Sequence, residues 1–335
     1  MSSTQIFVTG GSGFVGGEIL RRLVADGRAV RALAHSPGSA ERLAGMGATP
    51  VSADLLDPRG LAEAMAGTGC VYHAAGLNAF CLRDPAPLYT VNVAGSVSVI
   101  EAAALAGVPR VVYTSSASTI GEAPGTIGRE DSPHRGRFTS DYEHAKHDAE
   151  RAVLAAGRDR GVEVVSVNPS SVQGPGRTRG TARLLIDYLN GRLKFFVDTH
   201  LSLVDIADCA SGHLLAEERG VAGERYVLNG ACLTSAEALA LLSRLGGAEH
   251  RVRTLPAGVA MVGASVVEAA CALLRRIPPV CREQARAVAH GHRYDGSRAT
   301  RDLGLAYTPI EETLARTIAW YREHGYVRPR AESGS

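Results

Sequence analysis

The chain has 335 residues, and its 36 Lys and Arg against 34 Asp and Glu give a formal net charge of +2 with His neutral. This balance argues against a dedicated nucleic-acid-binding protein. Hydrophobic residues make up 45% of the chain, so it can bury a large core and is neither disordered nor fibrous. The length fits one large domain, or one domain with a smaller lobe.

Short apolar runs alternate with helical patterns along the first half of the chain. The expected strands cover residues 5–9, 29–34, 49–52, 70–73, 110–114 and 163–168, and the expected helices cover 14–26, 40–46, 61–66, 87–106 and 142–157. Each crossover helix must return over the sheet, so this order predicts an α/β fold with a doubly wound parallel sheet of the Rossmann type. We assign residues 1–175 to this dinucleotide-binding domain.

The strict alternation ends after about residue 175. Helical patterns at 181–189, 205–217, 235–245 and 310–324 predict a smaller, mainly substrate-binding lobe over 176–330, followed by a solvated tail over 331–335. In the weakly apolar stretch 256–274, one approximate helical face carries Val259, Val262, Val266 and Leu273. Glu268 would be costly in lipid, so we expect a buried or cleft-covering helix and no membrane span.

The cysteines, the histidines and the N-terminal residues indicate in which compartment the protein works and whether it binds a metal. The six cysteines (Cys70, Cys81, Cys209, Cys232, Cys271 and Cys281) include no C-x-x-C pair, and the eleven His are scattered without a metal-ligand pattern. The first residues lack the basic start and long apolar segment of a signal peptide. We therefore expect reduced cysteines, a cytoplasmic location and no bound metal.

A glycine-rich turn follows the first expected strand. Residues 10–16 read GGSGFVG and fit both G-x-x-G-x-x-G and G-x-G-x-x-G. Glycine here permits an unusual turn, close approach of the backbone to a pyrophosphate and close packing of the next helix. That helix would offer its free N–H groups and positive dipole to the phosphates. An ordinary tight turn can also contain such glycines, but the position between a strand and an apolar helix favours a dinucleotide site.

The end of the second expected strand bears on the choice of dinucleotide. An NAD site holds the ribose hydroxyls with an Asp or Glu there, whereas this chain has His35 and Ser36. An acid would repel a 2′-phosphate, and Arg31, His35 and Arg42 lie near this point of the sequence. The pattern favours NADP(H), with NAD(H) as the alternative, although the same three side chains would also suit a solvated surface.

A Y-x-x-x-K pattern lies on the expected helix 142–157. Tyr142 and Lys146 fall on one helical face about a turn apart. An ammonium beside a phenol lowers the pKa of the phenol, so Tyr142 would exchange a proton with a carbonyl or alcohol near neutral pH. Many Tyr–Lys pairs at this spacing are only solvated surface pairs. Here, however, the expected strand 110–114 is followed by residues with hydroxyl groups at the edge of the sheet. There Ser116 would donate a hydrogen bond to the substrate oxygen.

Together these segments resemble the extended short-chain dehydrogenase/reductases over nearly the whole chain. The matching pieces are TGGSGFVG, Asp54-Leu55, HAAG at 73–76, YTVNVAGS at 89–96, YTSSAS, YEHAK and NPSSVQGPG at 168–176. Within the family, the chain is most similar to dihydroflavonol-reductase-like and hopanoid-associated members. The set of motifs is specific for the family and says little about the substrate.

The resemblance implies roles for individual residues. Ser116, Tyr142 and Lys146 would form a catalytic triad, with Lys146 also holding the nicotinamide ribose. The implied cofactor contacts are Gly10, Gly13, Phe14, Val15, Gly16, Asp54, Leu55, Ala74, Ala75, Gly76, Thr114, Pro169 and Val172, beside Arg31 and His35 from the second strand. Asn92 matches a family Asn, and a bond to neighbouring backbone is its alternative role. Substrate contacts are expected from Leu77, Asn78, Phe80, Ser118 and Gln173.

These residues favour an NADP(H)-dependent oxidoreductase that reduces a ketone or aldehyde of a fairly apolar small molecule, or oxidises the alcohol. The alternatives are a nucleotide-sugar epimerase or dehydratase with tightly bound NAD(P), and a non-catalytic NADP-sensing regulator. Residues 167–174 lack the aromatic-Asn-Tyr-Gly type of segment that is usual in such epimerases. Plant-type reductases carry Arg where this chain has His35. A neutral imidazole is a poorer partner for a phosphate than a guanidinium, so His35 weakens the NADP assignment. A homodimer through helices at 87–106 and 142–157 is usual in the family.

Overall fold

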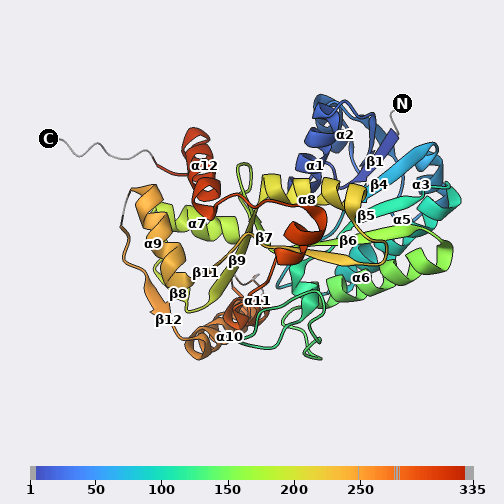
Figure 1. The fold of residues 1–335 in the computed structure, drawn as a ribbon. Coiled ribbons are helices and arrows are strands. Elements are labelled where there is room, and N and C mark those ends of the chain that lie inside the picture. Colours follow the sequence, from blue (N-terminus) through green and yellow to red (C-terminus); the bar gives the residue numbers. More distant parts are fainter. Residues whose placement is uncertain (1–4, 248, 275, 277, 279, 329–335) are drawn as a thin grey trace.

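The core of the structure is a parallel sheet of seven strands in the order β10-β6-β5-β4-β1-β2-β3 (Figure 1). The computed structural model describes residues 5–247, 249–274, 276, 278 and 280–328, and the expected tail at 331–335 lies outside them. The strands are β1 (Gln5–Thr9), β2 (Val30–Ala34), β3 (Thr49–Ser52), β4 (Thr68–His73), β5 (Arg110–Thr114), β6 (Glu163–Pro169) and β10 (Arg225–Leu228). The strand order reverses between β1 and β4, which is where open α/β sheets bind ligands.

Helices cover both faces of this sheet because the strands are apolar on both sides. From β1, Ile6 and Val8 pack with α1 (Phe14–Ala25), α2 (Pro37–Gly45) and α8 (Ile206–Arg219). Phe7 points to the opposite face and packs with α3 (Pro58–Met65), α5 (Gly95–Leu105) and α6 (Asp141–Arg160). Successive side chains of a strand point to opposite faces of the sheet, so one strand contributes side chains to the hydrophobic cores on both faces. The expected doubly wound Rossmann fold is confirmed.

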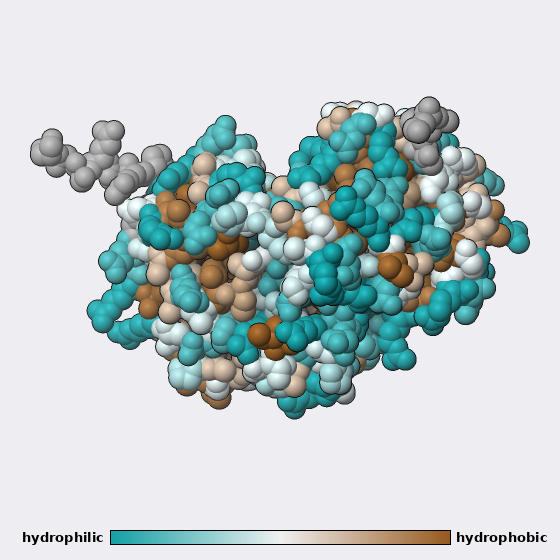
Figure 2. Space-filling model, viewed as in Figure 1, coloured by the Kyte–Doolittle hydropathy of each residue, from teal (hydrophilic) through white to brown (hydrophobic). Residues whose placement is uncertain are grey.

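A smaller lobe lies beside the sheet and closes one end of it (Figure 1). It contains a three-stranded sheet of β7 (Ser171–Gln173), β9 (His200–Asp205) and β11 (Ala231–Thr234), and a pair of β8 (Phe195–Val197) and β12 (Arg253–Leu255). Its helices include α7 (Thr181–Leu189), α9 (Ser235–Gly246) and α12 (Ile310–Glu323). Figure 2 shows a notch in the molecular surface between the two parts. Since α8 and β10 join the large sheet, segment 176–330 contributes to both parts, which the predicted division at residue 175 did not anticipate.

One helix in the described part of the chain is long and apolar enough to cross a membrane by length and composition. It covers residues 86–105, where α4 (Ala86–Tyr89) continues through a π-helical turn at Thr90–Ala94 into α5. Half of it is buried, and Val99, Ile100 and Ala103 are completely buried in the core under the sheet. Core helices pass the same test, and this one packs as a core helix.

The apolar helix expected at 256–274 forms as α10 (Ala257–Leu273), but its valine face is not buried. Val259, Val262, Val266 and Leu273 are 54 to 86% exposed. The helix packs instead against α11 (Arg282–His290). The expectation of a buried or cleft-covering helix is therefore wrong for this face, which is exposed, and no described α10 residue lines the cleft. Periodicity reveals an apolar face without revealing what contacts it.

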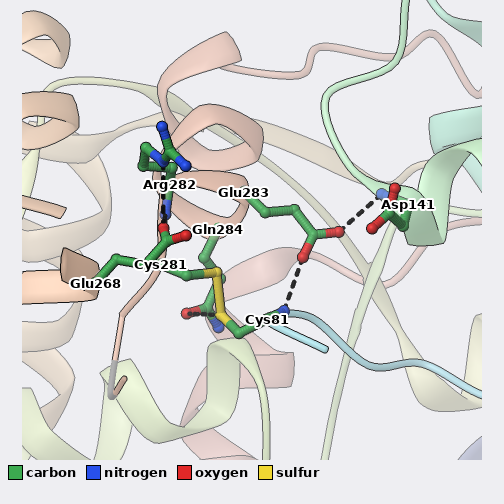
Figure 3. The surroundings of a disulfide bond; sticks show 7 residues. All are labelled: Cys81, Asp141, Glu268, Cys281, Arg282, Glu283 and Gln284. Atoms are coloured by element: carbon green, nitrogen blue, oxygen red, sulfur yellow. Dashed lines mark hydrogen bonds and ion pairs between the residues drawn. A yellow bond between two sulfur atoms is a disulfide. The ribbon is translucent and has the colours of Figure 1, made fainter. Parts of the chain in front are cut away.

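A disulfide bond joins Cys81, in the loop after β4, to Cys281, which directly precedes α11 (Figure 3). The expectation that all cysteines are reduced is wrong for this pair. The fold brings the two Cα atoms to 5.8 Å across a sequence separation of 200 residues, which lies within the range that a disulfide needs. The Glu283 carboxylate adds to the link, accepting hydrogen bonds from the backbone N–H groups of Cys81 and Asp141 at 2.7 Å each (Figure 3).

We predict that this disulfide stabilises the protein against unfolding. It closes a long loop of the unfolded chain, and removing such a bond costs about 2–5 kcal/mol. The double variant Cys81→Ser/Cys281→Ser should therefore unfold at lower urea concentration than the wild type under non-reducing conditions. Cys232→Ser, which removes an exposed free cysteine, is the control and should unfold like the wild type. Equal midpoints for the wild type and the double variant would contradict the prediction.

Candidate active site

A cleft of about 550 Å³ opens at the carboxyl ends of the strands, between the large sheet and the lobe. It brings together most of the residues that the sequence singled out. These are Gly10, Gly13, Phe14, Val15, Gly16, Ala74, Ala75, Gly76, Leu77, Asn78, Phe80, Asn92, Thr114, Ser116, Ser118, Tyr142, Lys146, Pro169 and Val172. The glycine turn and the expected triad therefore face the same space.

The glycine turn is built so that backbone lies against backbone. Gly10 has a φ of +72°, and a Cβ there would lie 2.5 Å from the Ala74 carbonyl carbon. A Cβ on Gly16 would overlap the Gly10 carbonyl group, so α1 can pack this closely only with glycine at that position. A Cβ on Gly13 would meet only the Gly10 oxygen, at 3.2 Å, so this side of the turn is open.

The N-terminus of α1 beside this turn has no side-chain cap. Its first N–H groups are therefore available to an anion, and the helix dipole favours negative charge there. The open side of Gly13 allows a pyrophosphate to approach the backbone closely. A nicotinamide dinucleotide fits these residues.

Tyr142 lies on the first turn of α6, directly after the helix begins at Asp141. Burial raises the pKa of its phenol, while a hydrogen bond with Ser116 and the charge of Arg177 lower it, and the net direction is upward. The Ser116 hydroxyl lies 2.9 Å from the Ser118 hydroxyl at the start of a 3-10 turn after β5. The upward direction of this pKa differs from the expected acidification of Tyr142 by Lys146, and it favours the neutral phenol.

Lys146 instead bonds to the end of β5. Its Nζ donates to the Tyr113 hydroxyl and to the Thr114 carbonyl oxygen, both at 2.9 Å. The side chain is only 4% exposed, and burial lowers its pKa to about 8, although the charge of Glu150 one turn further along α6 opposes this. A buried amine loses the hydration that favours its charged form. Lys146 therefore joins α6 to the edge of the sheet, and its burial favours the neutral amine.

Two further buried polar groups fix the walls of the cleft. Glu150 accepts hydrogen bonds from Ser166 on β6, at 2.9 Å, and from Asn168, and it pairs with Arg225 on β10 at 3.1 Å. Asn92 in the π-helical turn accepts from the Leu77 N–H at 2.7 Å and donates to the Leu77 carbonyl at 2.9 Å. Bonding to neighbouring backbone is the alternative role considered for Asn92, and here it holds the loop that carries Leu77.

Five expected residues do not line the cleft: Arg31, His35, Asp54, Leu55 and Gln173. Arg31 donates to the carbonyl oxygens of Ala64 and Ala66, at 2.9 and 2.8 Å, and to the Gln5 side chain, so it is engaged away from the cofactor end of β2. His35 is exposed at that end. The Gln173 side chain is completely buried and donates to Thr181 Oγ1 at 2.9 Å. The prediction that Arg31 contacts a cofactor phosphate is wrong, because Arg31 lies near the start of β2, away from its carboxyl end.

Sequence reasoning missed residues that reach the cleft from distant parts of the chain. The Arg177 guanidinium lies 6.0 Å from the centre of the Phe14 ring and donates to the Val172 carbonyl. From α11, Ala287 and Val288 line the cleft opposite the glycine turn. Arg177 follows the glycines at 174 and 176, which marks it as a loop residue near the cofactor, whereas no local signal places α11 here.

We predict that Lys146 titrates near pH 8 in the cofactor-free protein. The chain contains only two lysines, Lys146 and Lys194, so selective ¹³C-lysine labelling gives two side-chain signals in an NMR titration. The variant Lys194→Arg assigns them. Because the pKa is about 8 in the folded protein against the ordinary lysine value of 10.5, this group should add stability as the pH rises between these values. A midpoint above pH 10 for Lys146 would contradict its burial.

Comparison with known proteins supplies the family. Residues 6–228 match the model of the NAD dependent epimerase/dehydratase family. The chain is 34% identical over 331 residues to a Synechocystis protein provisionally named a dihydroflavonol 4-reductase, covering 96% of each. It is 32% identical to sterol demethylase protein B of Methylococcus capsulatus, covering 96% of this chain and 99% of that one.

Among solved structures, gox2253 superposes with a TM-score of 0.84 at 29% identity, covering 98% of this chain and all of the other. A dTDP-glucose 4,6-dehydratase of Streptomyces venezuelae with bound NAD superposes with a TM-score of 0.78 at 23% identity and shares the fold. The resemblance stated from the motifs is confirmed. The chain belongs to the NAD-dependent epimerase/dehydratase family and is an NAD(P)-dependent enzyme of the extended short-chain dehydrogenase/reductase superfamily.

Proposed function

We propose that the protein is an NADP(H)-dependent carbonyl reductase that acts on a fairly apolar small molecule, or oxidises the corresponding alcohol. The observation that carries this proposal is the shared cleft, in which Ser116, Tyr142 and Lys146 face the glycine turn. Relatives named as reductases support it. They include a ketoreductase of Stigmatella aurantiaca, 32% identical, and a 2-alkyl-3-oxoalkanoate reductase of Stenotrophomonas maltophilia, also 32% identical.

The glycine turn and α1 would hold the pyrophosphate of the dinucleotide, and Lys146 and Thr114 would lie along its ribose. When bound, the nicotinamide supplies or accepts a hydride. In the direction of reduction, the Ser116 hydroxyl would donate a hydrogen bond to the carbonyl oxygen of the substrate. Tyr142, protonated at neutral pH, would transfer its phenolic proton to that oxygen as the alcohol forms.

The lining of the cleft supports an apolar substrate. Leu77 and Phe80 lie on the loop after β4, Leu201 comes from β9, and Ala287 and Val288 come from α11. The Phe80 ring lies 5.7 Å from the Tyr142 ring, centre to centre, so an apolar group beside the reacting carbonyl would contact it. The names of the relatives agree with this class, since they include a farnesyl-substituted quinoline oxide and a sterol.

The preference for NADP(H) is part of the proposal and now depends on Arg42. Its side chain is exposed and donates to the Ser12 carbonyl of the glycine turn at 3.2 Å. Exposed His35 stands at the end of β2, where an NAD site would have an acid. A 2′-phosphate at this point would have a guanidinium within reach and no carboxylate to repel it.

The cytoplasmic location and the homodimer through helices at 87–106 and 142–157 stay predictions. A disulfide between Cys81 and Cys281 is unusual for a reducing compartment.

We predict that Tyr142→Phe lowers kcat by about 10²–10⁴-fold, because it removes the proton donor, and leaves NADPH binding nearly unchanged. Consumption of NADPH with a panel of apolar ketones measures the first effect, and quenching of protein fluorescence measures the second. Tyr89→Phe is the control, since Tyr89 bonds to His144 of α6 and neither residue lines the cleft. Full activity in Tyr142→Phe would refute the mechanism, and substrate conversion without net NADPH consumption would favour an epimerase.

We predict that Arg42→Gln raises the KM for NADPH about 10-fold or more relative to the KM for NADH, because a charged hydrogen bond to the phosphate is lost. Arg31→Gln is the matched control and should leave this ratio unchanged, since Arg31 bonds to Ala64 and Ala66. An unchanged ratio in Arg42→Gln would contradict the assignment of Arg42 to the phosphate.

A further inference from the structure

Three side chains that could ligate a metal ion meet at the edge of the cleft, whose lining includes His292, and none of them has a part in the proposed reaction. Glu122 lies just after the 3-10 turn that follows Ser116, His290 is the last residue of α11, and His292 follows it after Gly291. Their ligand atoms lie within 4.8 Å of one another. Glu122 Oε1 is 3.2 Å from His290 Nε2 and 2.7 Å from His292 Nδ1.

The polar atoms of this cluster do not all have a suitable hydrogen-bond partner among the described residues. Glu122 is only 2% exposed, and its second oxygen, Oε2, has no partner among the residues that the structure describes. His292 Nδ1 lies 2.7 Å from Glu122 Oε1 and also 2.9 Å from the Tyr294 hydroxyl. This nitrogen has either one proton or one lone pair, so it cannot donate to the carboxylate and accept from the phenol together. A buried carboxylate oxygen without a partner costs free energy.

We infer that Glu122, His290 and His292 form a binding site for a divalent transition metal ion of the Zn²⁺ type. Two imidazoles and one carboxylate are a common ligand set for zinc. Ligand atoms about 2.0–2.2 Å from one metal ion lie about 2.8–3.1 Å apart at octahedral angles and about 3.3–3.6 Å apart at tetrahedral angles. The observed 3.2 Å lies within this range and the observed 2.7 Å just below it, so a small separation of Glu122 and His292 would admit the ion. With both imidazoles neutral, the three groups carry one negative charge, which suits a cation.

An ion held by this cluster would join two segments that lie far apart in the sequence. Glu122 belongs to the part of the molecule built on the large sheet, whereas His290 and His292 belong to α11 and the residue pair after it. The other end of α11 is already fixed by the Cys81–Cys281 disulfide. A metal ion would fix the second end, so that Ala287 and Val288 are held in the wall of the cleft. Three protein ligands leave one position for water.

Only a weak sequence signal marks this site. His290 and His292 form an H-x-H pair, but Glu122 lies 170 residues before His292. Only the packing of α11 against the turn after β5 joins them, which is why the histidines had no recognisable ligand pattern.

The test is metal binding by the intact, chelator-treated protein. Zn²⁺ titrated into it in a calorimeter should bind at one ion per chain, and Co²⁺ should give visible absorption bands typical of imidazole and carboxylate ligation. Glu122→Gln and His292→Gln should each weaken Zn²⁺ binding by at least about 10–100-fold. His324→Gln is the matched control, because His324 stacks on Trp320 away from the cluster, and it should bind like the wild type.

Thermal unfolding gives a second readout that needs no activity. Zn²⁺ should raise the Tm of the wild type and of His324→Gln, because an ion that binds only the folded state stabilises it, and at the same Zn²⁺ concentration should raise the Tm of Glu122→Gln by clearly less. Should a variant fail to fold, the stoichiometry and Co²⁺ spectrum of the wild type still decide. Absence of stoichiometric binding by the wild type, or equal binding by Glu122→Gln, would overturn the inference and identify the cluster as a metal-free ion pair.

Discussion

The burial of the Lys146 ammonium at the end of β5 is the constraint on which the rest of the site depends. Its two hydrogen bonds, to Tyr113 and to the Thr114 carbonyl, join α6 to the strand that leads to Ser116. An amine in this position loses its hydration, which lowers its pKa to about 8. The same contact brings the first turn of α6, with Tyr142, over the cleft where the glycine turn opens. The proposed chemistry needs α6 to be held in this position against β5.

The opposite wall of the cleft is held by interactions between distant parts of the chain. The disulfide and Glu283 connect the start of α11 to the loop after β4 and to the first residue of α6. The cluster of Glu122, His290 and His292 connects its other end to the turn after β5. The substrate wall therefore depends on α11, while the neighbouring helix α10 leaves its valine face exposed.

The sequence predicted the features that depend on local patterns. The strand, glycine turn and helix at residues 5–25 follow from neighbours in the chain, and Tyr142 and Lys146 share a helical face because they are four residues apart. It did not predict the partners of Lys146, since Tyr113 and Thr114 depend on how α6 sits on the sheet. Arg31 was misplaced because a residue near the start of a strand lies far from the edge where ligands bind. The disulfide has no local signal at all across 200 residues.

The central claim is that this cleft brings a bound nicotinamide and a carbonyl carbon together above Tyr142. The most direct measurement is the fate of deuterium when the enzyme reduces a ketone with NADPH that carries deuterium on one face of C4. The account predicts that the label from one face only appears on the carbinol carbon, one deuterium for each NADPH oxidised. Recovery of the label in solvent, or its retention on the dinucleotide with both of the two C4-labelled forms of NADPH while the product forms, would contradict it.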